Sequence, residues 1–264
     1  MSWWQALILG LVQGLTEFLP VSSSGHLTIG RELLGAGAAE DLSFEVVVHA
    51  ATVLATLIVF RKQISGLLAG LFKFKYNEET DYILKICISM IPVFIVGVFF
   101  KDLVENLFSS IFVVGGALIV TAALLFFSDK ASEKRGTTPD NGGLNFKQAF
   151  IVGLGQALAV IPGLSRSGTT ISVGLLCGMK RDSVAQFSFL MVIVPILGEA
   201  FLDVVGGDFA ASSVGMLPLS VGFVSAFISG LFACKVMIAL VKKASLKWFA
   251  LYCAVVGAAV LIFA

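Results

Sequence analysis

The chain has 264 residues, of which 58% are hydrophobic and only 13% are charged, and its mean hydropathy is +0.98. A soluble domain carries about 25% charged residues, so this composition excludes the ordinary soluble classes and predicts an integral membrane protein. The net charge of +1 says nothing about partners, whereas the lack of a basic stripe outside the loops argues against nucleic acid as a partner. The four cysteines show no CxxC spacing, which favours buried thiols over a metal site or disulfides.

In chain order, the first residues lack a basic stretch and a small-residue cleavage site, so no removable signal peptide is expected. Two apolar stretches, at about 3–19 and 149–162, run into a proline and then a polar turn. A broken backbone inside a membrane must be buried in protein or line a wet cavity. Both stretches therefore predict re-entrant helix–loop–helix hairpins, at about 3–30 and 149–180. Six other stretches are long and apolar enough to span a bilayer: about 44–60, 83–100, 107–127, 183–205, 214–241 and 246–264.

The charged residues predict the orientation of these spans. Fourteen of the 18 lysines and arginines fall in 61–85, 128–149, 180–181 and 242–247. The loops on the other side hold two basic residues, Arg31 and Lys101. They hold more acidic residues, namely Glu32, Glu40, Asp41, Asp102, Glu105, Asp203 and Asp208. The positive-inside rule then places the basic segments in the cytoplasm and both termini outside. This assignment is self-consistent only if each hairpin enters and leaves on one side.

A sixteen-residue pattern occurs twice, 143 positions apart. It reads GLVQGLTEFLPVSSSG at 10–25 and GLGQALAVIPGLSRSG at 153–168, and seven of the sixteen positions agree. Three predicted spans follow each copy, and an odd number of spans inverts the second half relative to the first. The sequence therefore predicts an all-α, inverted-topology repeat, with halves 1–127 and 149–264, a cytoplasmic linker at 128–148, and hairpin tips that meet near the midplane.

The first tip carries acid–base chemistry. Gln13 and Glu17 stand four residues apart, on one helical face. A carboxylate inside a bilayer costs about 2.5–3.5 kcal/mol, so Glu17 should face a partner or a cavity; the structural alternative is a hydrogen bond between helices. After Pro20 come three serines that can cap the next helix, a glycine that lets another group approach the backbone closely, and a histidine. These residues are Ser22, Ser23, Ser24, Gly25 and His26. His49 stands alone on an apolar span with Glu45 one turn earlier; it could lie beside the site residues, but it is interpreted as a satisfied core histidine.

The second tip carries the features of an anion site: Ser165, Arg166, Ser167, Gly168, Thr169 and Thr170. Free N–H groups at a helix start attract anions, and the guanidinium fork of Arg166 suits phosphate. The structural alternative for Arg166 is a salt bridge to Glu17 across the pseudo-two-fold axis. Together the tips supply a nucleophile, a proton carrier and positive charge, which are the parts of phosphoryl transfer. Glu17 with Gln13 also suits a hard divalent cation.

These motifs resemble the undecaprenyl-diphosphate phosphatase family, also known as bacitracin-resistance proteins, and the resemblance covers the whole chain. The first family motif stands here as Gln13 to Glu17 and then Pro20-Val21-Ser22-Ser23-Ser24-Gly25-His26. The second stands as Pro162-Gly163-Leu164-Ser165-Arg166-Ser167-Gly168-Thr169-Thr170. Gln13 takes a position that is glutamate in many members, so a metal site here would rest chiefly on Glu17.

The resemblance implies a hydrolase that converts undecaprenyl diphosphate to undecaprenyl phosphate, the lipid carrier for peptidoglycan and other envelope glycans. It implies a site that opens to the outer, periplasmic face of the bacterial cytoplasmic membrane, a need for Mg²⁺ or Ca²⁺, and a role in bacitracin resistance. The partners are then the polyprenyl diphosphate and membrane lipids, and a homodimer is a compatible assembly.

The expected roles follow from this chemistry. Arg166 and the turn 165–170 bind the diphosphate together with Ser22, Ser24 and Gly25, while Glu17, assisted by Gln13, holds the metal. Ser23 is the expected nucleophile and His26 its base and later acid, because a hydroxyl needs an adjacent base. A histidine nucleophile and direct attack by a metal-activated water both stay open.

The main alternative function is a secondary transporter or lipid flippase, because inverted repeats with broken helices at the midplane are typical of transporters. Transport needs no nucleophile, so the set of Ser23, His26 and Arg166 discriminates the two. A channel or a purely structural membrane protein would not explain charged groups at this depth.

Overall fold

The protein is all-helical in the part described by the computed structural model, which comprises residues 1–36, 42–100, 103–104, 107, 110–135, 144–198, 214–243 and 245–263; no strand occurs in these ranges. The end of the fourth predicted span, 199–205, lies outside them. So do several residues used to predict the orientation: Glu40, Asp41, Lys101, Asp102, Glu105, Asp203 and Asp208. The predicted all-α class is therefore confirmed for the described residues.

The helices fall into two sets along the chain. The first set is α1 (Trp3–Thr16), α2 (Ser23–Leu34), α3 (Leu42–Val59), α4 (Arg61–Leu71), α5 (Glu78–Phe99) and α7 (Ile111–Arg135). The second set is α8 (Phe146–Leu158), α9 (Arg166–Leu176), α10 (Arg181–Met191), α12 (Met216–Lys243) and α13 (Lys247–Phe263). Within the described residues, each of the six predicted spans overlaps a helix, and each predicted hairpin region contains a pair of shorter helices.

Four helices in the described ranges are long and apolar enough to cross a membrane: α5, α7, α12 and the segment Arg181–Gly198 that extends α10. Helices α3 and α4 are long and apolar enough only when they are taken together, and they meet at a bend of 74°. They make a fifth candidate if this bent pair is one span. Helix α13 is apolar but shorter. The chain is thus a multi-pass membrane protein, and its outer helices expose large apolar side chains, such as Phe94 (68%), Ile228 (61%) and Leu251 (56%), as lipid contact requires.

Two predicted loops are partly helical. The basic segment 61–85 contains α4 and the start of α5, where the side chain of Asn77 caps the helix by accepting from Thr80 N at 2.8 Å. Helix α7 runs on to Arg135, so the first residues of the predicted linker are helical, and Asp129 is fully buried. Arg181 and Ser245 both donate to the Asp129 carboxylate, and this pairing compensates its burial.

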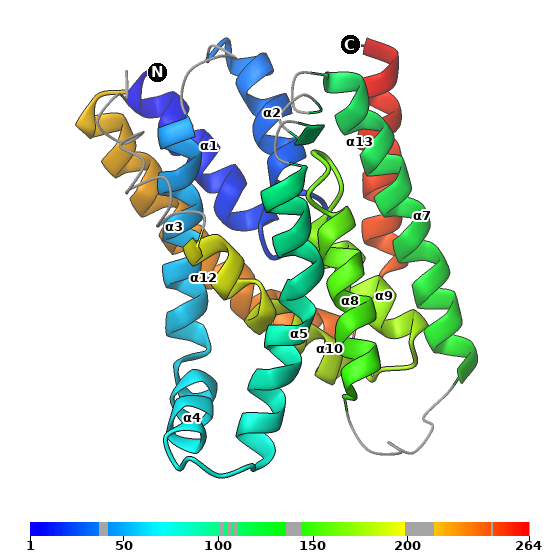
Figure 1. The fold of residues 1–264 in the computed structure, drawn as a ribbon. Helices are drawn as coiled ribbons and strands as arrows, with labels where there is room; N and C mark the ends of the chain where they lie inside the picture. Colours follow the sequence, from blue (N-terminus) through cyan, green and yellow to red (C-terminus); the bar gives the residue numbers. More distant parts are fainter. Residues whose placement is uncertain are drawn as a thin grey trace.

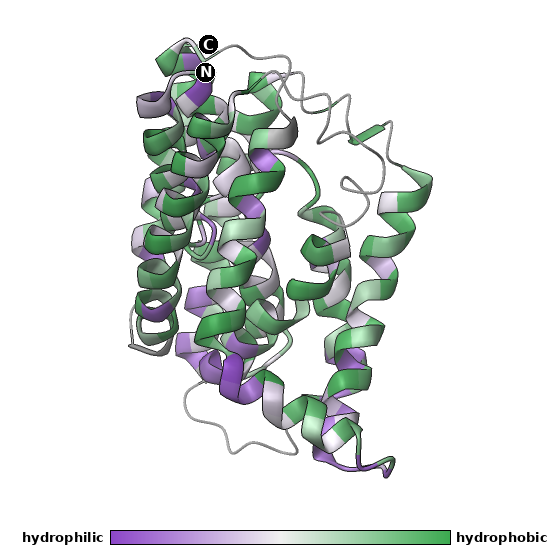
Figure 2. Ribbon diagram, turned by 90° about the vertical axis from the view of Figure 1, so that its left-hand side faces the viewer, coloured by the Kyte–Doolittle hydropathy of each residue, from purple (hydrophilic) through white to green (hydrophobic). Residues whose placement is uncertain are grey.

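The two hairpins approach the middle of the molecule from opposite ends. Figure 1 shows both termini at one end of the molecule and the α4–α5 connection at the other. Helix α1 runs from the first end to the middle and α2 returns, whereas α8 and α9 form the corresponding pair from the opposite end (Figure 1). Figure 2 shows hydrophobic residues along the length of the outer helices and hydrophilic residues gathered at the end opposite the termini.

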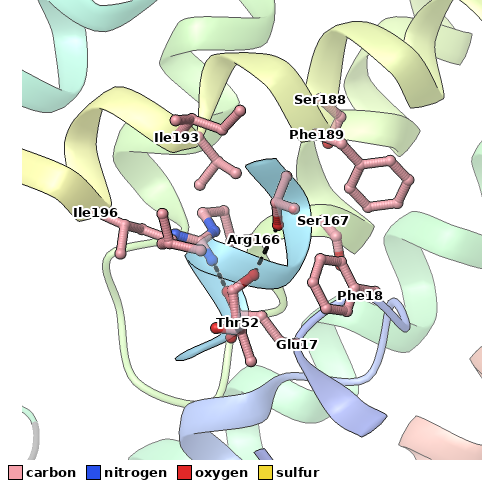
Figure 3. A pocket seen from close by; sticks show the side chains of 12 residues that line it. Glu17, Phe18, Thr52, Arg166, Ser167, Ser188, Phe189, Ile193 and Ile196 are labelled. Carbon is pink, nitrogen blue, oxygen red and sulfur yellow. Dashed lines mark hydrogen bonds and ion pairs between the residues drawn. The ribbon is translucent and has the colours of Figure 1, made fainter. Parts of the chain in front are cut away.

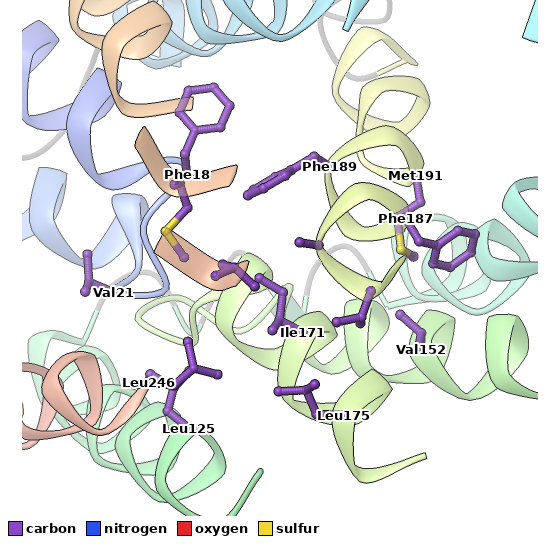
Figure 4. Close-up of a cluster of buried hydrophobic side chains, with 14 of the residues drawn as sticks. Phe18, Val21, Leu125, Val152, Ile171, Leu175, Phe187, Phe189, Met191 and Leu246 are labelled. Atoms are coloured by element: carbon purple, nitrogen blue, oxygen red, sulfur yellow. The ribbon is translucent and has the colours of Figure 1, made fainter. Parts of the chain in front are cut away.

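A buried hydrophobic cluster anchors both tips, as Figure 4 shows. Phe18 and Val21 enter it from the first turn, and Ile171 enters it from α9. Phe18 meets Phe189 of α10 edge to face, with ring centroids 6.1 Å apart. The apolar residues between the polar ones in each tip therefore fix the turns against a shared core.

Glycines let the hairpin helices pack directly on long helices of the other half. A Cβ on Gly14 of α1 would lie 2.5 Å from the carbonyl oxygen of Ala226 in α12. A Cβ on Gly153 of α8 would lie 2.3 Å from the carbonyl oxygen of Ser89 in α5. We call these two helix contacts the α1–α12 seam and the α8–α5 seam. No side chain larger than that of glycine fits in either seam, so the backbones of the paired helices are in direct contact.

Candidate active site

The two polar turns lie against each other. Ser167 Oγ donates a hydrogen bond to the carbonyl oxygen of Leu19 at 3.1 Å. A Cβ on Gly25 would stand 3.3 Å from Gly163 Cα, which shows how closely the two backbones approach. Ser167 and Gly25, two of the small residues shared by the motifs, therefore lie where the tips touch.

The shared serines cap the outgoing helices in the same way. Ser22 Oγ accepts from Gly25 N at 3.2 Å, and Ser165 Oγ accepts from Gly168 N at 3.1 Å. Ser22 adopts φ = 70°, a conformation that favours glycine, and its cap and the packed tips hold it there. The repeated Ser-x-Ser-Gly pattern thus encodes a helix start at each tip.

Replacing Gly163 with alanine should destabilise the second tip. Gly163 has φ = +86°, and a Cβ there would lie 2.5 Å from the carbonyl oxygen of Val114. We expect a loss of about 1–3 kcal/mol, read as a lower melting temperature of the purified protein. Gly66→Ala is the matched control, since a Cβ on Gly66 meets nothing within 4 Å. Equal melting temperatures for the two variants would contradict this packing.

Glu17 receives donors from both halves of the chain. Ser23 Oγ donates to Glu17 Oε2 at 2.6 Å, and Gln13 Nε2 donates to the same oxygen at 2.9 Å. The Arg166 guanidinium donates to the other oxygen, Oε1. The side chain of Glu17 is 4% exposed and that of Arg166 is 29% exposed, so the ion pair between the tips has a buried carboxylate and a partly buried guanidinium. The salt bridge considered as a structural alternative for Arg166 is therefore present.

His49 lies beside this cluster, so the structure favours the alternative of a histidine next to the site over its interpretation as a core histidine. Its Nδ1 lies 2.8 Å from the carbonyl oxygen of Glu45, which can only accept, so Nδ1 carries the proton. Its Nε2 lies 3.8 Å from Glu17 Oε2, and 27% of its side chain is exposed. The sequence pointed to a polar surrounding for His49, because Glu45 lies one turn earlier on the same helix. Glu45 is itself paired with Arg31 at 2.8 Å.

His26 is held by two contacts. Its Nδ1 lies 2.7 Å from the carbonyl oxygen of Ser22, so the hydroxyl of Tyr252 donates to Nε2, also at 2.7 Å. The two rings stack with centroids 5.5 Å apart. Tyr252 comes from α13, and sequence reasoning did not single it out. The role of His26 as base for Ser23 stays a prediction, since the Ser23 hydroxyl here donates to Glu17.

The remaining residues of the second motif lie inside the packing of α9. The backbone N–H of Ser165 donates to Thr121 Oγ1 at 3.0 Å, which joins this tip to α7. The hydroxyl of Thr170 bonds to that of Ser188 on α10 at 2.6 Å. Thr169 is 2% exposed. In this structure, Arg166 is the residue of the motif that pairs directly with the first tip's carboxylate.

A small cavity lies beside the ion pair (Figure 3). Its volume of about 20 Å³ has room for about one water molecule. The lining combines residues of the two tips with residues of α3 and of α10 and its extension: Glu17, Phe18, Thr52, Val53, Thr56, Arg166, Ser167, Ser188, Phe189, Val192, Ile193 and Ile196. The α3 and α10 residues carry no sequence motif that assigns them to the site.

The site offers few protein ligands to a metal ion. Within the described ranges, no three His, Cys, Asp or Glu side chains form a metal-binding group. Gln13 Oε1 is buried and lacks a hydrogen-bond partner among the described residues, and it lies on the side chain that bonds Glu17. One carboxylate with one amide oxygen fits Mg²⁺, which usually keeps several waters and binds substrate phosphates.

Comparison with known proteins identifies the family. The sequence profile of the family "Bacitracin resistance protein BacA" matches residues 6–259. A Parabacteroides distasonis protein named "Undecaprenyl-diphosphatase" is 57% identical over 261 residues, covering 97% of this chain and 96% of the relative. Proteins of that name from Bacteroides fragilis (97% and 96% covered) and Christiangramia forsetii (100% and 99%) are 55% and 50% identical. The chain therefore belongs to the BacA family of bacitracin resistance proteins.

Proposed function

We propose that this protein is an undecaprenyl-diphosphatase, which releases phosphate from undecaprenyl diphosphate and leaves undecaprenyl phosphate. The observation that carries the proposal is the cluster of Ser23, Glu17 and Arg166 between the two tips, in a chain similar to the named relatives over nearly its whole length. A transporter or flippase would need neither the hydroxyl nor the acid beside it, so that alternative is not favoured.

The roles divide between the tips. Arg166 and the α9 helix start bind the terminal phosphate, assisted by Ser165, Ser167, Gly168, Thr169 and Thr170, and by Ser22, Ser24 and Gly25 of the first tip. Ser23 Oγ attacks the terminal phosphorus, the bond to the lipid phosphate oxygen breaks, and water then releases the phosphate from Ser23. The 2.6 Å bond from Ser23 supports Glu17 as the group that takes the Ser23 proton. The lipid phosphate leaves as an anion, and His26, whose Nε2 can accept a proton, serves as the base for the water that releases the phosphate from Ser23.

Glu17 and Gln13 would hold Mg²⁺ or Ca²⁺ together with oxygens of the diphosphate. When bound, such a cation supplies positive charge to the phosphate oxygens. Arg166 must release Glu17 Oε1 as it turns to the phosphate, so the ion pair is the resting arrangement of the site. His49, 3.8 Å from Glu17, remains beside the carboxylate in either arrangement.

For the membrane topology we propose six spans and two re-entrant hairpins, arranged as an inverted repeat of 1–127 and 149–264 around the linker 128–148. The reciprocal seams support it, because the first hairpin lies on α12 and the second on α5. The basic loops would be cytoplasmic and both termini outside, in the bacterial cytoplasmic membrane, with the site open to the periplasmic face. A homodimer is compatible with this arrangement.

The direct test is phosphate release from undecaprenyl diphosphate by the purified protein, with and without Mg²⁺ or Ca²⁺. We expect cation-dependent release that is lost in Ser23→Ala and strongly reduced in His26→Ala. Full activity of Ser23→Ala would assign the attack to water or to His26. No release from a folded, lipid-supplemented wild-type sample would reject the phosphatase and favour transport.

A further inference from the structure

The cavity beside Arg166 has a polar side and an apolar side. Glu17, Arg166 and Ser167 make the polar side. Six apolar side chains make the other: Phe18, Val53, Phe189, Val192, Ile193 and Ile196. Figure 3 shows the Arg166 side chain between Thr52 of α3 and the pair Ile193 and Ile196, which follow α10. The cavity therefore matches an amphiphile with an anionic head and a hydrocarbon chain.

Thr52 and Thr56 line the cavity on the side of α3, called here the α3 wall, and their hydroxyls already have hydrogen-bond partners. Thr52 Oγ1 donates to the carbonyl oxygen of His49 at 2.8 Å, and Thr56 Oγ1 donates to the carbonyl oxygen of Thr52 at 2.9 Å. A threonine that bonds back to its own helix has a satisfied hydroxyl and still offers its methyl group for apolar contact. Hydrocarbon can therefore contact this wall without leaving a buried hydroxyl unpaired.

Both walls continue to lipid-facing surface. The neighbours of the lining residues are exposed and apolar: Leu54 (40%) and Ile58 (37%) on α3, Val194 (54%) and Leu197 (44%) after α10. At 1.5 Å per residue, Thr52 lies about 15 Å along α3 from Leu42, and Ile193 about 18 Å along its helix from Arg181. Both therefore lie near the middle of a hydrocarbon layer about 30 Å thick.

Other sides of the hairpins are closed by backbone contact. Gly14 abuts Ala226 at the α1–α12 seam, and Gly153 abuts Ser89 at the α8–α5 seam. Opening either seam would separate whole helices. Between α3 and α10, by contrast, the cavity is lined by side chains that can change rotamer without breaking a backbone contact.

We propose that the prenyl chain of the substrate leaves the diphosphate site sideways, between α3 and the α10 segment, over Val53, Ile193 and Ile196. The inference rests on the proposed function and adds where the chain goes. A volume of about 20 Å³ is too small for a chain, so these side chains part when the lipid enters. The bilayer then solvates the rest of the chain while the diphosphate reaches Arg166.

Kinetics with matched tryptophan substitutions test this path. Ile196→Trp fills the path, and Val194→Trp is its control, placed two residues away on the lipid-facing side. We expect Ile196→Trp to raise the KM for undecaprenyl diphosphate about ten-fold or more and to leave the inhibition constant of inorganic diphosphate, which has no chain, unchanged. Val194→Trp should change neither. A rise in both constants, or in neither, would overturn the proposal.

A second pair of variants keeps the test valid if Ile196→Trp does not fold. Val53→Phe lies on the α3 wall and should act like Ile196→Trp, and Leu54→Phe is its control.

Independently of activity, a prenyl diphosphate with a benzophenone at the end of a short chain should label peptides of α3 and α10 in the wild-type protein. Labelling confined to α1, α12 or α13 would refute the path. If the protein releases no phosphate from undecaprenyl diphosphate but labels on α3 and α10, the proposed function fails and the chain path stands.

Discussion

Arg166→Ala is expected to abolish phosphate release, with a loss in kcat/KM of about 10³-fold or more. Arg166 is the cation paired with Glu17 at the point where the tips meet, and it is the first residue of α9. Without it, neither the bound diphosphate nor the charge that develops on the phosphate oxygens is compensated. The measurement is steady-state kinetics on purified, membrane-extracted protein, with undecaprenyl diphosphate as substrate.

This loss must be separated from a loss of stability. Removing one partner of a buried ion pair costs about 3–5 kcal/mol, because the other charge is left unpaired. The double variant Arg166→Ala/Glu17→Gln should therefore melt at a higher temperature than Arg166→Ala and remain inactive. Arg166→Lys keeps the charge but not the fork, and we expect it to recover only a small part of the rate. A well-folded Arg166→Ala with near wild-type kinetics would remove Arg166 from the mechanism.

The second large effect is expected for Glu17→Gln, which keeps the shape of the side chain and removes its charge. Ser23, Gln13 and Arg166 would then share a neutral amide instead of a carboxylate. We expect kcat to fall by about 10²-fold or more, because the group that takes the Ser23 proton is lost. Titration of the purified protein with Mn²⁺ or Ca²⁺ by calorimetry should show a matching loss of cation affinity.

Gln13→Glu is the informative counterpart. It adds a second carboxylate on the same helical face, and more ligand charge should tighten cation binding. Tighter binding in Gln13→Glu with weaker binding in Glu17→Gln would locate the cation between these residues. Unchanged cation affinity in both variants would move the metal site elsewhere.

The sequence predicted the contact between the tips because the information is local and repeated. Proline, glycine and capping serines at fixed offsets define two helix starts. A single carboxylate and a single arginine in apolar surroundings are expected to form an ion pair, because an unpaired charge there is costly. The salt bridge of Glu17 with Arg166 was accordingly available as an alternative from residue chemistry alone. The helical class followed from composition, whereas the exact ends of α5 and α7 depended on caps and on the pairing of Asp129.

The residues that sequence reasoning missed come from other helices. Tyr252 reaches the site because α13 packs beside the tips, and nothing in its local pattern encodes that packing. His49, for which a place beside the site was one of two interpretations, is brought there by the packing of α3. Thr52 and Ser188 likewise look like ordinary polar residues of apolar helices until the cavity is formed. Local propensity identifies the turns, but the neighbours of the turns are set by tertiary packing.

The seams between the halves impose an order on the assembly of this protein during its synthesis. Gly14 packs on Ala226, so the first hairpin has no final partner until nearly all of the chain has entered the membrane. Until the second half arrives, Glu17 has only Gln13, Ser23 and His49 of the first half beside it and no arginine. Newly made chain therefore lacks the ion pair between the tips, and the site is complete only when α9 docks.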